Sequence, residues 1–308
     1  MTTIKAKAFA KLNLTLEVLG KRNDGFHEIS SIMQTISLAD RIEVTAAREL
    51  SLECDLPSLN NNENLAMRAA CLIRESLNIK YGAQIRISKQ IPLASGLGGG
   101  SSDAVVVLKL LRRLWALELT DIDLLKMVAE IGSDLPFFVN GGTAVVQGKG
   151  DRVRQIPHKK STFFVVVVPE LDMQDKTKGM YSKLDPSDFT NGGLTRKLEA
   201  RIRGGGDIPD QLLHNAFQDV SLRTVPSVRK SYEALQAVGR QEIHLTGSGP
   251  ALFSRVSSHN TGRAIQLLLQ YQHGENSFVV ESAPVSYTHL RAHETEAALV
   301  CRLLREKK

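Results

Sequence analysis

The stretch Pro92-Leu93-Ala94-Ser95-Gly96-Leu97-Gly98-Gly99-Gly100-Ser101-Ser102-Asp103 decides the fold of this 308-residue chain. Its closely spaced glycines let the backbone approach an anion, and successive amides can point inward as a phosphate nest. The apolar run that follows predicts a long helix over 104–117 that starts from the loop, so its first amides and its positive dipole end face the same anion. A flexible glycine turn is the alternative on these residues alone. The stretch is neither a Walker A loop nor a dinucleotide fingerprint, because it lacks their spacing.

Strands and helices alternate irregularly on both sides of the glycine loop, which favours an α+β fold over a doubly wound sheet. A chain of this length is longer than one hydrophobic core usually serves, so we expect two domains, at 1–155 and 156–284. Hydrophobic periodicity predicts strands at 4–18, 29–44, 83–89, 137–146 and 163–168, and helices at 65–77, 121–131, 226–238 and 262–271.

Composition is that of an ordinary folded protein, with 42% apolar and 23% charged residues. The net charge of +6 could suit nucleic acid, but the basic residues are scattered and few residues are aromatic. An anionic small substrate explains the charge equally well, and we expect no nucleic-acid partner. We expect no membrane partner, because apolar runs are short and no signal core follows Met1. Cys54, Cys71 and Cys301 lack metal-ligand spacing and are interpreted as packing residues of a cytoplasmic protein.

The string from Pro92 to Ala104 closely resembles the central motif of the GHMP kinases, which are named for galactokinase and the homoserine, mevalonate and phosphomevalonate kinases. The segments 8–14 and 245–251 resemble that family's flanking motifs in the same order. The resemblance implies a two-domain GHMP kinase fold: an N-terminal domain like the second domain of ribosomal protein S5, then a ferredoxin-like domain, with the site between them. It also implies ATP and Mg²⁺, and a monomer or weak dimer.

Three further segments, 11–14, 22–28 and 132–138, most resemble one branch of that family. This branch phosphorylates the 2-hydroxyl of 4-diphosphocytidyl-2-C-methyl-D-erythritol, on the methylerythritol phosphate route to isoprenoids. The resemblance runs from about residue 4 to residue 284. Two alternatives remain: a GHMP kinase for another small alcohol, and a catalytically dead member that binds or senses metabolites.

Phosphoryl transfer requires that the protein position the two substrates, stabilise the negative charge and place a base near the attacking hydroxyl. The resemblance assigns the base to Asp134, which otherwise reads as a turn residue before Pro136. Lys11 and Asn13 share one face of a strand by its two-residue period. Under the resemblance Lys11 orients Asp134 and Asn13 holds the substrate, whereas a strand-edge lysine in solvent is the alternative.

The remaining predicted site residues fall into two groups. Phe26 and His27 would meet the cytosine by stacking and by a polar contact, although Phe26 lacks the phenolic hydroxyl of the more usual Tyr. Two residues of the sets below also have a purely structural alternative: Asn64 could cap the following helix, and Gly247 could belong to a plain tight turn. The predicted ATP-binding residues are Pro92, Gly96, Leu97, Gly98, Gly99, Gly100, Ser101, Ser102 and Asn64. The predicted substrate-binding residues are Asn13, Phe26, His27, Thr177, Gly247 and Ser248, and metal ligands are left unassigned.

The final segment, 285–308, is foreign to the family pattern. Residues 285–295 resemble the translation of a sequencing-library adaptor, so we favour an assembly artefact over a genuine C-terminal helix. His289 and His293 have helical metal-pair spacing, but a lone pair predicts no site.

Overall fold

Two very long strands form the centre of the larger sheet. The computed structural model describes residues 2–157, 160–170 and 177–283. In it β1 (Thr3–Lys21) and β2 (His27–Ala47) pair antiparallel along nearly their whole length. Within the described residues the sheet has seven strands, in the order β3-β4-β2-β1-β8, with β5 paired to β2 and β6 paired to β5. The smaller strands are β3 (Ser51–Cys54), β4 (Gly82–Ser88), β5 (Thr143–Gly148), β6 (Arg152–Gln155) and β8 (His214–Asn215).

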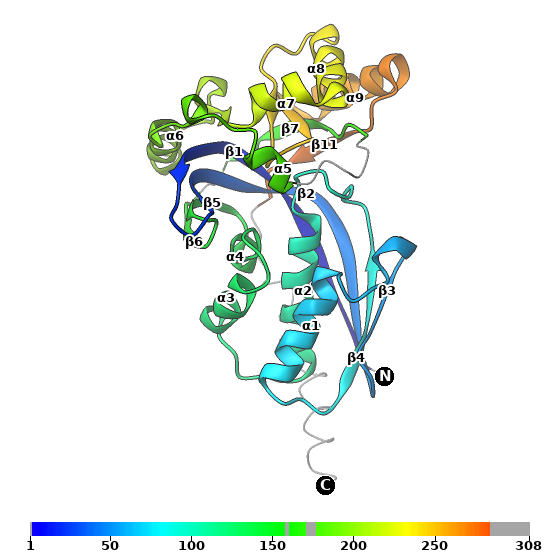
Figure 1. Cartoon of the computed structure of the whole chain (residues 1–308). Helices are drawn as coiled ribbons and strands as arrows, with labels where there is room; N and C mark the ends of the chain where they lie inside the picture. The colour runs from blue at the N-terminus through cyan, green and yellow to red at the C-terminus, as the bar shows by residue number, and fades with distance from the viewer. Residues whose placement is uncertain (1, 158–159, 171–176, 284–308) are drawn as a thin grey trace.

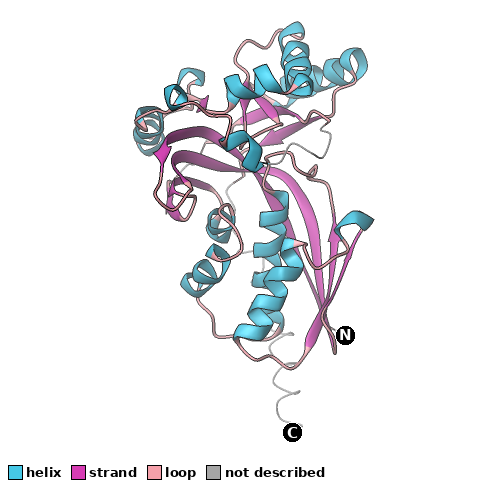
Figure 2. Ribbon diagram, viewed as in Figure 1, coloured by secondary structure: helices cyan, strands magenta, loops and turns pink. Residues whose placement is uncertain are grey.

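Four helices from the first half of the chain cover one face of this sheet (Figures 1 and 2). Apolar side chains on that face, such as Ile42 and Val44, pack against the buried side of α2. Almost every apolar residue of α2 is buried, so it is the central helix of this layer. The helices are α1 (Leu65–Ser76), α2 (Gly99–Leu114), α3 (Asp121–Ala129) and α4 (Leu135–Asn140).

A second sheet of four strands, in the order β11-β7-β10-β9, forms the core of the second half. The predicted buried strand at 163–168 is confirmed as the central β7. The second half also supplies β8, which pairs parallel with β1 of the larger sheet. The strands are β7 (Phe163–Val167), β9 (His244–Leu245), β10 (Leu252–Val256) and β11 (Ser277–Glu281). The helices are α5 (Thr177–Tyr181), α6 (Gly193–Arg203), α7 (Gln218–Thr224), α8 (Pro226–Ala237) and α9 (His259–His273).

The arrangement confirms a two-sheet α+β fold, with local differences from the predicted elements. The predicted strand over 137–146 is wrong, because 135–140 is the short helix α4 and only 143–148 is a strand. Pro136 lies in the first turn of α4, where its fixed φ favours a helix. Gly141 and Gly142 then take positive φ values, +61° and +71°, and end it. No helix of the described ranges has the length and apolarity needed to cross a membrane.

The helix predicted over 104–117 begins earlier and ends earlier than expected, at Gly99 and Leu114. Its Lys109 is buried rather than solvent-facing and donates a hydrogen bond to the carbonyl of Val139 in α4. Burial lowers the pKa of Lys109 to about 7. This contact ties α4 to α2 and so helps to place Asp134, the residue just before α4. The tail 285–308, which includes His289, His293 and Cys301, lies outside the described residues.

Candidate active site

Irregularities in β1 bring the three sequence motifs together. The register of β1 against β2 shifts between Phe9 and Lys11 and again between Asn13 and Thr15. At these shifts the backbone N–H of Lys11 donates to the carbonyl of Leu97, at 3.0 Å, and that of Asn13 donates to Thr246 Oγ1, at 2.9 Å. Such bulges are common next to active sites. One strand therefore holds the glycine loop and the segment 245–251 at the same place.

The glycine loop leads directly into α2. Gly98 is the N-cap residue, in the left-handed conformation with φ +74°, and its carbonyl accepts the amide of Ser102 at 3.0 Å. The amides of Gly99, Gly100 and Ser101 are those that an α-helix leaves without an intrahelical partner. Gly99 is buried, but Gly100 is exposed and Ser101 half-buried, so the last two donors lie near the surface at the positive end of a 16-residue helix. The geometry suits an anion.

The segment 245–251 packs against the glycine loop. The amide of Ala251 donates to the carbonyl of Ser95 at 3.1 Å. A Cβ atom at Gly96 would lie 2.6 Å from the carbonyl oxygen of Thr246, and one at Gly247 would lie 2.9 Å from that of Gly96. Glycine is thus required at both positions by contact within the protein, and a plain isolated turn is excluded.

Lys11 is buried beside Asn13, as the strand period predicted, and the solvent-exposed alternative is wrong. Only 2% of Lys11 is exposed, and its Nζ donates to Asn13 Oδ1 at 2.6 Å. The same oxygen accepts the amide of Gly247 at 3.0 Å, while Asn13 Nδ2 donates to Ser31 Oγ at 2.8 Å. Asn13 is therefore a junction that holds Lys11 in place. Its carboxamide is engaged mainly within the protein.

Asp134 faces the Lys11 ammonium from the start of α4. The distance from Lys11 Nζ to Asp134 Oδ2 is 3.8 Å, an ion pair rather than a close hydrogen bond. Burial lowers the pKa of Lys11, and the negative charge of Asp134 partly opposes that shift. The Asp134 side chain is 41% exposed and makes no capping bond to α4. Its carboxylate is therefore available to a ligand instead of serving the turn.

A cavity of about 210 Å³ opens between these groups. It brings together residues predicted for both substrates, from segments far apart in the chain. Its walls include Lys11, Asn13, Gly96, Gly98, Asp134, Tyr181, Gly247 and Ser248.

With this geometry in place, the chain can be compared with known proteins. Residues 64–142 match the family described as GHMP kinases N terminal domain. A 4-diphosphocytidyl-2-C-methyl-D-erythritol kinase of Dehalococcoides mccartyi (strain BAV1) is 38% identical over 274 residues, which cover 89% of this chain and 96% of the relative. The corresponding kinase of Brevibacillus brevis is 37% identical over 82% of this chain and 87% of its own length. The chain belongs to this kinase family.

Solved structures agree with that membership. A crystal structure of 4-(cytidine 5'-diphospho)-2C-methyl-D-erythritol kinase has a TM-score of 0.77 and 29% identity, covering 91% of this chain and all of the other. A homoserine kinase from Cytophaga hutchinsonii has a TM-score of 0.70 at 17% identity, which shows the common GHMP kinase fold alone.

A buried charged cluster lies behind the glycine loop of this GHMP kinase, and sequence reasoning missed it. Lys89 Nζ donates to Asp40 Oδ2 at 2.5 Å and to Asp103 Oδ2 at 2.7 Å, and all three side chains are at most 4% exposed. Asp40 Oδ1 also accepts the amides of Gln90 and Ile91. Burial, helped by the negative Asp40, raises the pKa of Asp103 to about 7 although Lys89 opposes the shift. The cluster fixes the chain where it enters the loop.

The residues around the glycine loop fit a nucleoside triphosphate. Ser102 Oγ is buried at the first turn of α2 and has no hydrogen-bond partner within the described residues. No group of three or more His, Cys, Asp or Glu side chains in the described chain could hold a metal ion. Mg²⁺ characteristically takes few protein ligands together with substrate phosphates. This donor set fits a magnesium ion carried mainly by phosphate oxygens, with Ser102 Oγ as the candidate protein oxygen.

Aromatic side chains surround His27 at the opposite end of the site. The His27 ring lies 5.0 Å from that of Tyr181 and 6.1 Å from that of Phe189. Phe26 is half exposed, with Lys149 Nζ 5.0 Å from its ring centroid. Burial and the charge of Asp134 raise the pKa of Tyr181 to about 12, so its hydroxyl stays protonated. Tyr181 lines the cavity and links His27 to it. No local sequence signal pointed to Tyr181 or Phe189, which lie more than 150 residues after His27.

The structure describes the side-chain contacts of Asn64 but not those of Thr177, another predicted site residue. Asn64 is the N-cap of α1: its Oδ1 accepts the amide of Ala66 at 2.9 Å and its Nδ2 donates to the carbonyl of Leu59 at 3.0 Å. The capping interpretation is confirmed, and contact with adenine stays a prediction. Thr177 is the first residue of α5, but its side chain and the preceding 171–176 lie outside the described residues.

Replacing Gly98 with alanine tests the packing of the glycine loop. The new Cβ would lie 2.7 Å from Phe138 Cζ and 3.2 Å from Lys11 Cγ, at a positive φ that an L-residue rarely adopts. We expect Gly98→Ala to raise the KM for ATP about tenfold or more, because the loop and Lys11 must shift. Gly205→Ala is the matched control, since it has φ +72° but nothing within 4 Å. Equal kinetics in both variants would contradict the assigned packing.

Proposed function

We propose that this chain transfers the γ-phosphoryl group of ATP to the 2-hydroxyl of 4-diphosphocytidyl-2-C-methyl-D-erythritol. The observation that carries the proposal is the meeting of three elements in one cavity: the Lys11–Asp134 pair, the amino end of α2 and the segment at Gly247. The glycine loop supplies an anion site, and the pair supplies a base beside a cation. Such a combination serves phosphoryl transfer to an alcohol.

The loop positions the donor. The amides of Gly99, Gly100 and Ser101 donate to phosphate oxygens, supported by the dipole of α2. Pro92 and Leu97 set the path of the loop, since Leu97 is fully buried and its carbonyl is bonded to Lys11. Mg²⁺, when bound, neutralises charge on the phosphates. Ser102 Oγ is proposed as a protein oxygen for that ion.

Asp134 acts as the base at the acceptor hydroxyl. As the acceptor oxygen bonds to phosphorus, the bond from phosphorus to the ADP oxygen breaks and the hydroxyl proton passes to an Asp134 oxygen. The exposed carboxylate can reach a ligand in the cavity, whereas the buried Lys11 ammonium stabilises negative charge developing on the attacking oxygen. Asn13 serves the reaction by holding Lys11.

The aromatic group beside the cavity binds the acceptor. Phe26 can stack on a pyrimidine by its exposed face, and His27 can bond its polar edge. Burial lowers the pKa of His27, with the nearby Lys21 acting in the same direction, so the imidazole is neutral at pH 7. A neutral imidazole offers both a donor and an acceptor. Tyr181 and Phe189 complete the aromatic wall, and Ser248 and Thr177 are proposed to contact the rest of the substrate.

Other properties expected from the sequence also stand as proposals. We place the domain boundary near residue 155, which is supported by the end of β6 at Gln155 and the start of the second sheet at Phe163. A cytoplasmic monomer or weak dimer without a nucleic-acid or membrane partner is what family membership favours.

An ADP-release assay over a panel of alcohols tests the proposal. With ATP and Mg²⁺ we expect turnover of 4-diphosphocytidyl-2-C-methyl-D-erythritol, and turnover lower by about 10²-fold or more with homoserine or mevalonate, which lack a ring to stack on the aromatic wall. A preference for homoserine or mevalonate would assign the chain to another alcohol. Nucleotide binding without turnover of any of the three would indicate a non-enzymatic member.

A further inference from the structure

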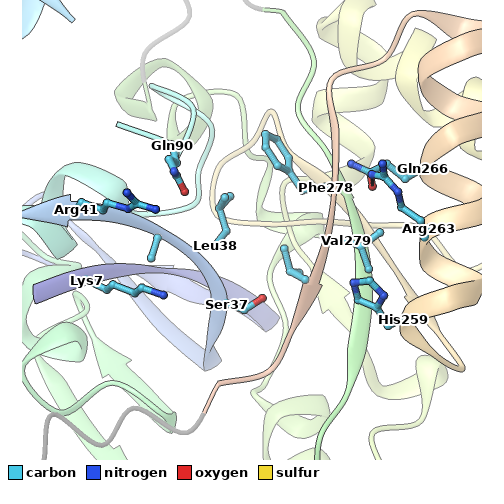
Figure 3. A pocket seen from close by; sticks show the side chains of 12 residues that line it. Lys7, Ser37, Leu38, Arg41, Gln90, His259, Arg263, Gln266, Phe278 and Val279 are labelled. Carbon is cyan, nitrogen blue, oxygen red and sulfur yellow. Dashed lines mark hydrogen bonds between the residues drawn. The ribbon is translucent and has the colours of Figure 1, made fainter. Parts of the chain in front are cut away.

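A second and larger cavity, of about 410 Å³, lies away from the candidate active site. Figure 3 shows the two walls of this cavity. The strands of the large sheet and the segment at Gln90 form one wall, with Lys7 and Arg41. β11 and α9 form the other wall, with Phe278 and Arg263. Its sheet wall is the face opposite α1 and α2, because the alternate residues Ala8 and Ile42 pack under those helices. The volume is typical of small-molecule sites.

The charged residues that line this cavity are all basic. Lys7 and Arg41 come from the sheet, and His259 and Arg263 from the amino-terminal part of α9. Lys7, Arg41 and Arg263 form no ion pair within the described residues. The positive end of the α9 dipole adds to their field. The cavity is therefore basic, with no carboxylate on its walls, and its basic side chains are solvent-exposed.

The strand register brings two of these basic side chains close together, which destabilises the fold. Lys7 and Arg41 are direct partners on β1 and β2, so two like charges face each other across the ladder. Such pairs are destabilising unless something neutralises them. The neighbouring acids are engaged elsewhere. On the same face Glu43 pairs with Lys5. Asp40 bonds Lys89 on the opposite face, and Glu281 bonds Ser161. An anion between the two cations would remove the repulsion.

One of the cations is already held in position, and part of the remaining wall is apolar. Arg263 Nη1 donates to Gln266 Oε1 at 2.6 Å, and the buried Gln266 donates in turn to the carbonyl of Ser277 at 2.5 Å. A fixed guanidinium loses little freedom when it binds a phosphate. Leu38 and Phe278 cover another part of the wall.

We propose that this cavity binds a small organic anion that carries at least two negative charges on phosphate groups together with a short apolar part. Phosphate oxygens bind Lys7, Arg41 and Arg263, and the apolar part lies against Leu38 and Phe278. The site is independent of the ATP loop, which lies on the other side of the large sheet.

Calorimetric titration of the full chain with inorganic pyrophosphate and with hexyl diphosphate tests this proposal. The variants are Arg41→Gln, Arg263→Gln and the matched control Arg48→Gln, an exposed arginine outside the cavity. We expect each cavity variant to weaken one binding event for both probes about tenfold, through loss of a charge-assisted contact. Arg48→Gln is expected to leave it unchanged. In the native chain hexyl diphosphate should bind more tightly than pyrophosphate at this site.

Thermal unfolding provides a second measurement that does not depend on kinase activity. Without ligand, Arg41→Gln is expected to be at least as stable as the native chain, because the repulsion with Lys7 is removed. Pyrophosphate is then expected to stabilise the native chain more than the variant. Equal binding and equal stabilisation in all four proteins would overturn the proposal, as would binding that responds only to Gly98→Ala, which alters the ATP loop. Failure here leaves the kinase assay unaffected, so the two proposals are separable.

Discussion

Asp134→Asn is expected to lower kcat by about 10²–10⁴-fold while leaving the affinity for ATP nearly unchanged. The carboxamide keeps the shape of the side chain but cannot accept the hydroxyl proton. Asp134 makes no capping bond to α4, so the substitution removes the base without uncapping the helix, although it weakens the 3.8 Å ion pair with Lys11. Single-turnover kinetics and nucleotide titration measure the two quantities separately.

The fold of this variant provides the control. The free energy of unfolding is expected to fall by about 1 kcal/mol, because Asp134→Asn removes the carboxylate that pairs with the buried Lys11, and the partial exposure of Asp134 limits the cost. Asp121→Asn, at an exposed carboxylate that pairs with Arg112 outside the site, is the matched substitution and should retain native turnover. Native turnover in Asp134→Asn would remove this residue from the role of base.

Lys89→Met is expected to destabilise the protein by about 3–5 kcal/mol, the typical cost of breaking a buried ion pair from one side. Lys89 is the shared partner of Asp40 and Asp103, and its loss leaves two carboxyl groups buried together behind the glycine loop. Urea unfolding measures the change. Lys5→Met, at an exposed pair with Glu43, is the control and should cost at most about 1 kcal/mol.

The cluster also predicts a pH dependence in the native chain. The pKa of Asp103 is raised to about 7 in the folded state, so between pH 4 and 7 the folded protein holds a proton that the unfolded chain has released. The contribution of this group to stability therefore falls as pH rises through that range. In Lys89→Met the positive charge is absent, so the deficit should be larger at pH 8 than at pH 5. A deficit below 1 kcal/mol at both pH values would contradict the assigned burial.

The parts of the structure that were predictable rest on local patterns. The glycine loop, the helix after it and the Lys11–Asn13 face follow from spacing along a single segment. The strand predicted at 137–146 failed because Phe137 and Phe138 favour strands in isolation, whereas Pro136 and the two glycines at 141–142 set the backbone. The strand propensity of the two phenylalanines is weak, and the φ angles set by the proline and the glycines override it.

The parts that were missed depend on contacts between distant segments. The cluster of Lys89, Asp40 and Asp103 joins three elements, and nothing in the local sequence marks Asp40 as buried. Tyr181 and Phe189 reach His27 only because the second half folds back, with β8 paired to β1. The bulges that direct the Lys11 amide to Leu97 are likewise a property of the paired strands.

Phosphorus NMR of the product formed from ATP and 4-diphosphocytidyl-2-C-methyl-D-erythritol tests the proposed reaction most directly. The carbon that bears the 2-hydroxyl also bears the methyl group and has no hydrogen. We therefore expect one equivalent of ADP and a new phosphate monoester whose signal shows no three-bond coupling to a proton. A new signal split by such coupling would place the phosphate on another hydroxyl, and the absence of any new monoester would contradict the proposed function.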